Sequence, residues 1–244
     1  MRARKMWELA ESKDSRLIVA LDSVPVEPRE LVGEVEEYAV GVKVGLPFLL
    51  RWGLQAVKEL CETFRGTLYL LCDFKLADIP PVVAEELKLI GELGFDGAIV
   101  HLFQGGIKSV STRGSRPDLF GLVAMTHPES KLLDAHFEEL TREALEAGLE
   151  GLVIPATKPE IVKAARKAAP GATLLAPGVG AQGPLPGSAL EAGADFEIVG
   201  RLIVASSDPR SAARAVRDAQ RAYQRGTRDA LARVSLIKVG EGWL

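Results

Sequence analysis

The sequence predicts an α/β fold, a single-domain (β/α)8 TIM barrel in which a parallel eight-stranded barrel is surrounded by outer helices. Short apolar runs recur along the 244 residues, and most are followed by an amphipathic segment. Eight such repeats in about 250 residues favour a barrel over an open doubly wound sheet, which has a similar local pattern. With 47% hydrophobic residues, the chain can also bury a sizeable core.

The predicted strands are apolar at consecutive positions, which is typical of parallel strands covered on both faces. In chain order they lie at residues 16–22, 38–45, 67–75, 96–103, 119–127, 150–157, 172–180 and 196–202. The amphipathic segments between and after them predict helices. Several begin near a proline or end near a glycine, and the clearest lie at 80–94, 137–148, 158–171 and 208–223.

We predict one domain over residues 1–244, because no linker-like stretch or shift in composition divides the chain. A short N-terminal helix is expected before the first strand. A C-terminal tail follows after about residue 223, beyond the eighth strand–helix unit.

The composition excludes several classes of protein. A net charge of −3 argues against a protein that binds nucleic acid by general phosphate neutralisation. No stretch approaches the roughly 20 apolar residues that cross a bilayer, and the basic start never reaches a signal-peptide core. Cys61 and Cys72 lack metal-ligand spacing, so we expect packing roles, a reducing compartment and a cytoplasmic protein.

Charged side chains stand at the predicted carboxyl ends of the first three strands, on the face where barrel enzymes build active sites. The first strand ends in Asp22, and the second contains Lys43. The third ends in Asp73 and Lys75, which are two residues apart and so point together toward the barrel mouth. Asp78 follows in a proline-stiffened loop, from which it reaches its own site or that of a neighbouring subunit.

Buried isolated charges cost several kcal/mol each, so two lysines and two carboxylates are expected to neutralise one another. A structural salt-bridge network is the competing interpretation of this cluster. Further charged strand ends in the same chain favour a catalytic cluster instead.

A second group of residues predicts a phosphate site. The seventh strand ends in the glycine-rich stretch Pro177–Gly183, and the eighth ends in Val199–Arg201. Backbone N–H groups of such a turn approach anions, and these two loops form the usual phosphate site of barrels. Arg201 is suited to bind phosphate oxygens bidentately.

The histidines do not predict a metal centre. His101 either lines the site or is a hydrogen-bonded histidine near the core, and His127 is expected to hold its loop beside Thr126. His136 falls at a helix start, where we expect it to be solvated. No two of the histidines have metal-ligand spacing together with a carboxylate, so we predict no catalytic zinc.

Taken in order, these motifs resemble the orotidine 5′-phosphate decarboxylase family over about Leu17 to Asp208. They are "ALD" from Ala20, "KVG" from Lys43, "DFKLADIP" from Asp73, "MTHP" from Met125, "PGVGAQG" from Pro177 and "VGR" from Val199. The resemblance implies decarboxylation of orotidine 5′-phosphate to uridine 5′-phosphate, in de novo pyrimidine synthesis, with no metal or cofactor. It also implies a homodimer with shared active sites.

The resemblance also implies roles for individual residues. Lys43, Asp73, Lys75 and the partner's Asp78 form the catalytic set, in which Lys75 protonates C6 and Asp73 lies beside the departing carboxylate. The substrate-binding residues are Asp22 and Lys43 at the ribose, Thr126 at the pyrimidine, Gln182 and Arg201 at the phosphate, together with Ile79, Pro177, Gly178 and Gly200. Val82 stands where the family pattern has a threonine.

The chemistry agrees with these roles independently of the resemblance. Loss of CO₂ from C6 leaves a carbanion in the ring plane with no adjacent carbonyl to stabilise it, so an ammonium group held at that carbon is the available stabiliser. Two alternatives stay open: a Mg²⁺-dependent hexulose-phosphate synthase-like enzyme of the same barrel group, and a non-catalytic nucleotide-binding barrel.

Overall fold

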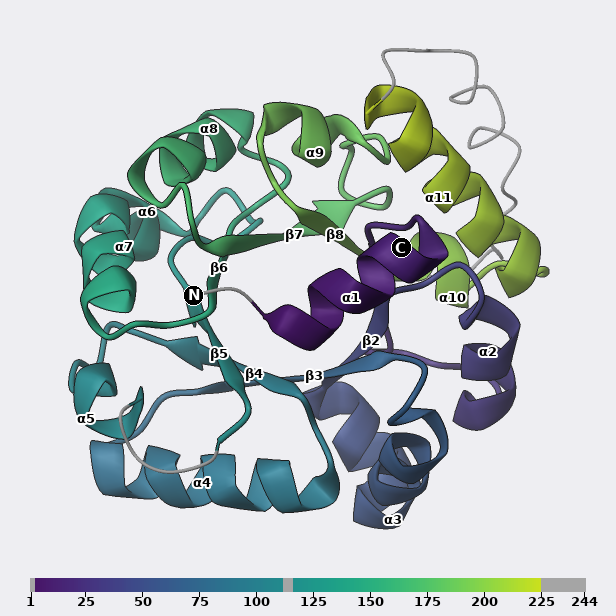
Figure 1. Ribbon diagram of the computed structural model, residues 1–244, viewed down its shortest axis with the longest axis horizontal. Helices are drawn as coiled ribbons and strands as arrows, with labels where there is room; N and C mark the ends of the chain where they lie inside the picture. The colour runs from purple at the N-terminus through teal and green to yellow at the C-terminus, as the bar shows by residue number, and fades with distance from the viewer. Residues whose placement is uncertain (1–2, 112–115, 225–244) are drawn as a thin grey trace.

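The computed structural model describes residues 3–111 and 116–224, and the strands within them form one closed, parallel barrel (Figure 1). Each strand pairs with the next, and β8 closes on β1 with Ile198 opposite Ile18. The predicted fold class is therefore confirmed. The strands are β1 (Leu17–Ala20), β2 (Gly41–Gly45), β3 (Tyr69–Leu76), β4 (Gly97–His101), β5 (Asp118–Leu122), β6 (Gly151–Val153), β7 (Thr173–Val179) and β8 (Phe196–Val199).

Helices surround the barrel (Figure 1). Several helices have a proline in their first two positions. Proline is well suited to a helix start, because the N–H that it lacks has no partner there and its fixed φ is already helical. Gly94, with φ 98°, ends one of them in the left-handed conformation. The helices are α1 (Arg4–Lys13), α2 (Pro28–Val35), α3 (Leu46–Phe64), α4 (Pro80–Leu93), α5 (Ile107–Ser111), α6 (Lys131–Ala135), α7 (Phe137–Glu146), α8 (Pro159–Ala168), α9 (Ser188–Ala192), α10 (Arg201–Val204) and α11 (Pro209–Gln224).

The core has two apolar layers, as expected for strands covered on both faces. Inward-facing side chains, including Tyr69, Phe120 and Phe196, fill the barrel. A larger layer between strands and helices contains Cys61 and Cys72, which are buried free thiols, as predicted. Burial of this continuous apolar surface supplies the main driving force for the fold.

Helix α1 is the predicted N-terminal helix, and it covers one end of the barrel (Figure 1). Its buried Met6 and Ala10 join the inner apolar layer, and Trp7 donates a hydrogen bond to Thr173 Oγ1 at 3.1 Å. Thr173 is the first residue of β7. Helix α1 therefore closes the amino-terminal end of the strands, called the foot below, and leaves the carboxyl-terminal end, the mouth, open for a site.

At the foot, a carboxylate immediately before each of β4, β6 and β8 bonds to the second residue of the preceding strand. Asp96 accepts from the Leu70 N–H at 2.8 Å, Glu150 from Leu119 at 2.9 Å and Asp195 from Leu174 at 2.8 Å. The N–H of each acidic residue also donates to the carbonyl of the same leucine. A cation pairs with each carboxylate: Lys5 with Asp96, Arg116 with Glu150 and Arg166 with Asp195. We call these three groups the foot locks.

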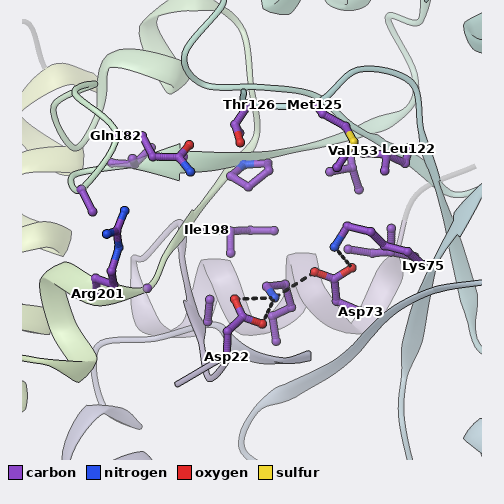
Figure 2. Close-up of a pocket in the computed structure, with 18 of the residues that line it drawn as sticks. Asp22, Asp73, Lys75, Leu122, Met125, Thr126, Val153, Gln182, Ile198 and Arg201 are labelled. Carbon is purple, nitrogen blue, oxygen red and sulfur yellow. Dashed lines mark hydrogen bonds and ion pairs between the residues drawn. The ribbon is translucent and has the colours of Figure 1, made fainter. Parts of the chain in front are cut away.

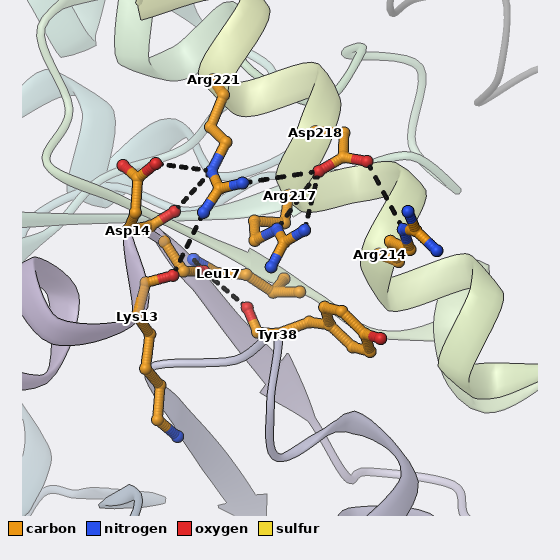
Figure 3. A network of polar contacts seen from close by, with 9 residues as sticks. Lys13, Asp14, Leu17, Tyr38, Arg214, Arg217, Asp218 and Arg221 are labelled. Carbon is orange, nitrogen blue, oxygen red and sulfur yellow. Dashed lines mark hydrogen bonds and ion pairs between the residues drawn. The ribbon is translucent and has the colours of Figure 1, made fainter.

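Helix α11 is fixed to the start of the chain by the polar network in Figure 3. Arg221 Nε donates to the Asp14 carbonyl at 2.8 Å and lies 2.9 Å from the Asp14 carboxylate. The guanidinium of Arg217 lies over the ring of Tyr38, 4.8 Å from its centroid. Helix α11 thereby holds the segment that leads into β1. Residues 225–244 of the predicted C-terminal tail lie outside the described residues.

Candidate active site

A cavity of about 270 Å³ opens at the mouth of the barrel (Figure 2). Most of the predicted site residues line it, although they come from strands far apart in the sequence, because all parallel strands end on this face. These residues are Asp22, Lys43, Asp73, Lys75, Thr126, Pro177, Gly178, Gln182, Gly200 and Arg201.

The charged residues form a chain of alternating sign. Lys43 Nζ lies 2.8 Å from Asp22 Oδ1 and 2.8 Å from Asp73 Oδ2, and Lys75 Nζ lies 2.9 Å from Asp73 Oδ1. The side chains of Lys43 and Asp73 are 6% and 7% exposed, whereas that of Lys75 is 38% exposed. The inner pair is therefore desolvated, and the ammonium of Lys75 is the member that a ligand can approach.

The electrostatics keep the inner pair ionised. Burial by itself would lower the pKa of Lys43, but the charges of Asp73 and Asp22 outweigh burial, and its pKa is raised. Burial would likewise raise the pKa of Asp73, but the ammonium groups of Lys43 and Lys75 outweigh it, and its pKa is lowered. Each buried charge is thus stabilised by its neighbours.

The end of β3 departs from a regular strand. Its register with β4 shifts between Cys72 and Leu76, and Lys75 has φ 50°, in the left-handed region. That conformation costs a non-glycine residue roughly 1–2 kcal/mol. Asp73 and Lys75 both line the cavity, while Phe74 packs in the outer layer against Phe95, as the sequence predicts. A bulge beside a site commonly redirects a side chain, and here the redirected residue is Lys75.

The predicted phosphate residues lie on the opposite side of the cavity. Figure 2 shows Gln182 and Arg201 together, across the cavity from Asp73 and Lys75. Arg201 is the first residue of α10, directly after Gly200. Gly178 has φ 101°, and a Cβ there would come within 2.9 Å of both the Gln182 and Thr126 side chains. Glycine is therefore required where the end of β7 passes these two residues.

The loop after β5 is held by residues that follow β6. Thr157 Oγ1 donates to the Thr126 carbonyl at 2.9 Å, and Lys158 Nζ donates to the His127 carbonyl at 3.3 Å. Lys158 also pairs with Asp134. These contacts fix Thr126 at the cavity, and His127 takes part in holding the loop through its backbone.

Comparison with known proteins identifies the family. A family model described as "Orotidine 5'-phosphate decarboxylase / HUMPS family" matches residues 15–216. The chain belongs to this family. Curated relatives named orotidine 5′-phosphate decarboxylase include one from Aeropyrum pernix, 40% identical over 72% of this chain and 75% of that protein. Another, from Methanosarcina barkeri, is 38% identical over 84% of this chain and 94% of that protein.

Solved structures of the family share the fold. An orotidine 5′-monophosphate decarboxylase from Sulfolobus solfataricus matches with a TM-score of 0.79 and 27% identity, over 86% of this chain and 99% of that chain. One from Methanocaldococcus jannaschii, complexed with the inhibitor BMP, matches with a TM-score of 0.75 and 30% identity, over 84% of this chain and 97% of that chain. The family predicted from the motifs is therefore confirmed.

Asp78 and Ile79 do not line the cavity of their own chain. Both are exposed, Ile79 to 63%, and the Ile79 N–H donates to Asp78 Oδ1 at 2.6 Å. They lie in the turn between β3 and α4, beyond Lys75.

Sequence reasoning missed the apolar floor of the cavity. The floor residues occupy inward-facing positions near the ends of strands and at the start of the following loops. Because side chains of a strand alternate between its two faces, counting every second residue would have identified them in the sequence. They are Ala20, Ile99, Leu122, Met125, Val153 and Ile198. His101, which the sequence left open, packs against Phe103 with ring centroids 4.9 Å apart and is not a lining residue.

Within residues 3–111 and 116–224, no group of three His, Cys, Asp or Glu side chains is arranged to hold a metal ion. In the same part of the chain, no helix combines the length and apolarity needed to cross a membrane.

Proposed function

We propose that this protein is a carboxy-lyase that converts orotidine 5′-phosphate to uridine 5′-phosphate and CO₂ in pyrimidine biosynthesis. One observation carries the proposal: a single cavity holds the alternating chain Asp22–Lys43–Asp73–Lys75 on one side and Gln182 with Arg201 on the other. A nucleotide with its phosphate at Arg201 spans this cavity and presents its ring to Lys75. The family and its similarly named relatives agree with this activity.

In the proposed mechanism, Lys75 is the proton donor. The bond between C6 and the carboxylate breaks, the electron pair stays on C6, and CO₂ leaves. The ammonium of Lys75 stabilises the developing negative charge and then transfers a proton to C6. The position of Lys75 at the open end of the charge chain, 2.9 Å from Asp73, supports this role.

Asp73 and Lys43 prepare the site. Asp73 accepts from both lysines, so it holds Lys75 at the reacting carbon and lies beside the departing carboxylate. Lys43 is buried between Asp22 and Asp73 and forms an ion pair with each carboxylate. Asp22, whose side chain is 48% exposed, can accept hydrogen bonds from the ribose hydroxyls.

The remaining contacts orient the nucleotide. Thr126 faces the pyrimidine edge from the loop after β5, and Gln182 and Arg201 bind the phosphate. The backbone of Pro177, Gly178 and Gly200 forms the cavity wall between them. Because phosphate binding is remote from C6, its binding energy is available for aligning the ring with Lys75.

We also propose a homodimer in which Asp78 and Ile79 of one subunit complete the site of the other. The exposed apolar side chains near the mouth support a partner on this face: Leu46, Leu50 and Leu54 of α3, and Ile79 and Val82 at the start of α4. Helices α3 and α4 are in contact and adjacent in Figure 1. Leu50 is 78% exposed, an unusual exposure for a leucine unless another surface covers it.

The activity is tested by following the absorbance of orotidine 5′-phosphate in the presence of the purified protein and a strong chelator. We expect full turnover in chelator and a product identical to uridine 5′-phosphate. Loss of activity on chelation would favour the Mg²⁺-dependent alternative, and binding without turnover would favour the non-catalytic nucleotide-binding barrel.

The shared site is tested by mixing Asp78→Ala protein with Lys75→Ala protein under conditions of subunit exchange. Each variant alone is expected to be nearly inactive. In a hybrid dimer one site keeps both native residues, so activity returns to about a quarter of the native level at equal mixing. No recovery, despite exchange demonstrated by mass spectrometry, would contradict the shared site.

The cysteines support a proposal for the location of the protein in the cell. We propose a cytoplasmic enzyme, because Cys61 and Cys72 are both free and buried, as expected for a protein of a reducing compartment.

A further inference from the structure

Glu197 is a buried carboxylate outside the catalytic cavity. It lies in β8 between Phe196 and Ile198, which point into the barrel, so its own side chain points outward into the helical layer. Its residue surface is 0% exposed. At most outward positions of these strands, such as Val19, Val42 and Val44, the side chain is apolar. A carboxylate at this place requires specific partners, because an uncompensated buried charge is strongly destabilising.

The partners of Glu197 lie at the start of α9 and on α11. Gly187 N–H donates to both carboxylate oxygens at 2.8 and 2.9 Å, and Ala189 N–H donates to Oε1 at 3.0 Å. Gln220 of α11 donates to Oε2 at 2.9 Å. Gly187 has no side chain with which to cap α9, so Glu197 satisfies the backbone donors that the helix start leaves open.

These contacts anchor one end of the loop that carries the phosphate residues. The loop runs from Gly180, just after β7, to Gly187, and it brings Ala181 and Gln182 to the cavity. Within it, Gly180 N–H donates to the Pro184 carbonyl at 2.8 Å. The β7 end is fixed by the barrel itself. The other end is fixed at Gly187, through the carboxylate of Glu197.

The same strand that carries Glu197 leads directly into the second phosphate residue. Strand β8 ends at Val199 and is followed by Gly200 and then Arg201, the first residue of α10. Glu197 thus couples the end of the Gln182 loop to the strand that delivers Arg201. This connection links the two segments that bring Gln182 and Arg201 to the same side of the cavity.

We propose that Glu197 is a positioning residue that sets the geometry of the phosphate site by holding the Gln182 loop against the strand that bears Arg201. This inference rests on the proposed function, since it assigns Gln182 and Arg201 to the phosphate. Glu197 acts without touching the ligand. Its effect is therefore specific to the phosphate and leaves the contacts of the pyrimidine and ribose unchanged.

The test is calorimetric titration of the Glu197→Gln variant with uridine 5′-phosphate and, separately, with uridine. Glutamine has nearly the same shape, but its NH₂ group replaces one of the two oxygens that accept from Gly187, Ala189 and Gln220, so fewer hydrogen bonds hold the loop end and it shifts. We expect the Kd for uridine 5′-phosphate to rise about tenfold or more, as for a displaced binding group. The Kd for uridine is expected to stay within about twofold, because its contacts are unchanged.

Asp195→Asn is the matched control. Asp195 is an acidic residue two positions earlier in the same chain segment, and it bonds to the Leu174 N–H and Arg166 rather than to the loop. This control is expected to lower the thermal stability and leave the ratio of the two Kd values at its native level. A second readout needs no ligand: hydrogen exchange at Gly187 and Ala189 is expected to accelerate in Glu197→Gln and not in Asp195→Asn.

The outcomes separate this inference from the proposed function. Native protein that fails to bind uridine 5′-phosphate would overturn both. Native protein that binds it, with a Glu197→Gln variant that keeps both affinities or loses both equally, would overturn only the role of Glu197.

A second variant keeps the test decisive if Glu197→Gln does not fold. Gly187 has φ 96°, and a Cβ there would press against the Tyr223 ring. Gly187→Ala therefore displaces the same loop end, and it is expected to weaken binding of uridine 5′-phosphate selectively. An unchanged ratio of the two Kd values in that variant would overturn the proposal.

Discussion

The mouth and the foot of the barrel both contain networks of acidic and basic side chains, but the networks differ in what satisfies them. In each foot lock, a carboxylate accepts from a strand N–H and pairs with one cation, so its partners all come from the folded chain. At the mouth, Asp73 is held between two ammonium groups, and the network ends at Lys75 on an open cavity. At the foot, every carboxylate of the locks is satisfied by groups of the protein. At the mouth, the ammonium of Lys75 faces the cavity, where a ligand can bind it.

The two ends also differ in how proton affinity is set. Lysines alternate with carboxylates at the mouth, and the pKa of Asp73 is lowered. At the foot, burial and then the charge of Glu150 raise the pKa of Asp118 to about 6, although the Tyr69 hydroxyl and Arg116 oppose the shift. The surroundings at the mouth thus favour the ionised form of Asp73. The surroundings at the foot disfavour the ionised form of Asp118. This difference agrees with a functional carboxyl-terminal face and a structural amino-terminal face.

The largest effect is expected from Lys75→Ala. Removing the ammonium that we propose faces C6 should lower kcat by about 10³-fold or more, since both charge stabilisation and proton transfer would be lost. The fold is expected to persist, because Asp73 keeps its ion pair with Lys43. Steady-state kinetics and circular dichroism measure the two properties. Lys163→Ala, at an exposed site on α8, is the control and should keep native activity. Near-native turnover by Lys75→Ala would exclude Lys75 as the proton donor.

The next effect is expected at the foot, and it concerns stability rather than rate. Asp96→Ala leaves the Leu70 N–H without its side-chain acceptor and removes the ion-pair partner of Lys5, which should cost about 3 kcal/mol. For a chain of this size that corresponds to a fall in Tm of roughly 6–12 °C. We expect kcat/KM of Asp96→Ala to equal that of the native protein at temperatures at which both are folded.

Lys5→Met is the matched variant for this lock, because it removes the partly exposed cation and leaves the backbone hydrogen bond to Asp96 intact. Its cost should be about 1 kcal/mol or less. A loss of activity without a loss of stability in either variant would contradict the structural role of the foot.

The smallest effect is expected from Asp118→Asn, and it depends on pH. Because the folded pKa of Asp118 is raised to about 6, the protonated form is favoured in the folded state. The stability that this group contributes is fully present below its unfolded pKa near 4 and is lost as pH rises through about 6. The asparagine side chain cannot ionise, and it can still accept from Tyr69. The variant should therefore gain Tm relative to the native protein between pH 5 and pH 8.

The size of this gain is limited because Asp118 is partly exposed and solvent screens its charge. We expect a difference of about 2–4 °C at pH 8, which corresponds to roughly 1 kcal/mol. Thermal unfolding across this pH range measures it. A difference in Tm that does not vary with pH would show that Asp118 keeps an ordinary pKa.

The barrel and most of the residues that line the cavity could be predicted from the order of apolar and charged residues along the chain. Consecutive apolar positions identify the parallel strands, and because all parallel strands end on one face, their terminal residues assign Lys43, Asp73, Lys75 and Arg201 to one cavity. The foot locks also carry a signal in the sequence, an acidic residue immediately before each of β4, β6 and β8.

How these side chains meet could not be predicted from the chain alone, because it depends on contacts between distant segments. The register shift and the φ of 50° that direct Lys75 arise from the pairing of β3 with β4, which no local pattern encodes. The structure also shows that Asp78 lies outside the cavity of its own chain. It further shows that Glu197 accepts hydrogen bonds from the start of α9, ten residues earlier, and from Gln220 on α11. Local periodicity reports which face of a strand is buried. The partner that a buried polar group finds depends on contacts between distant segments, which form only when the barrel closes.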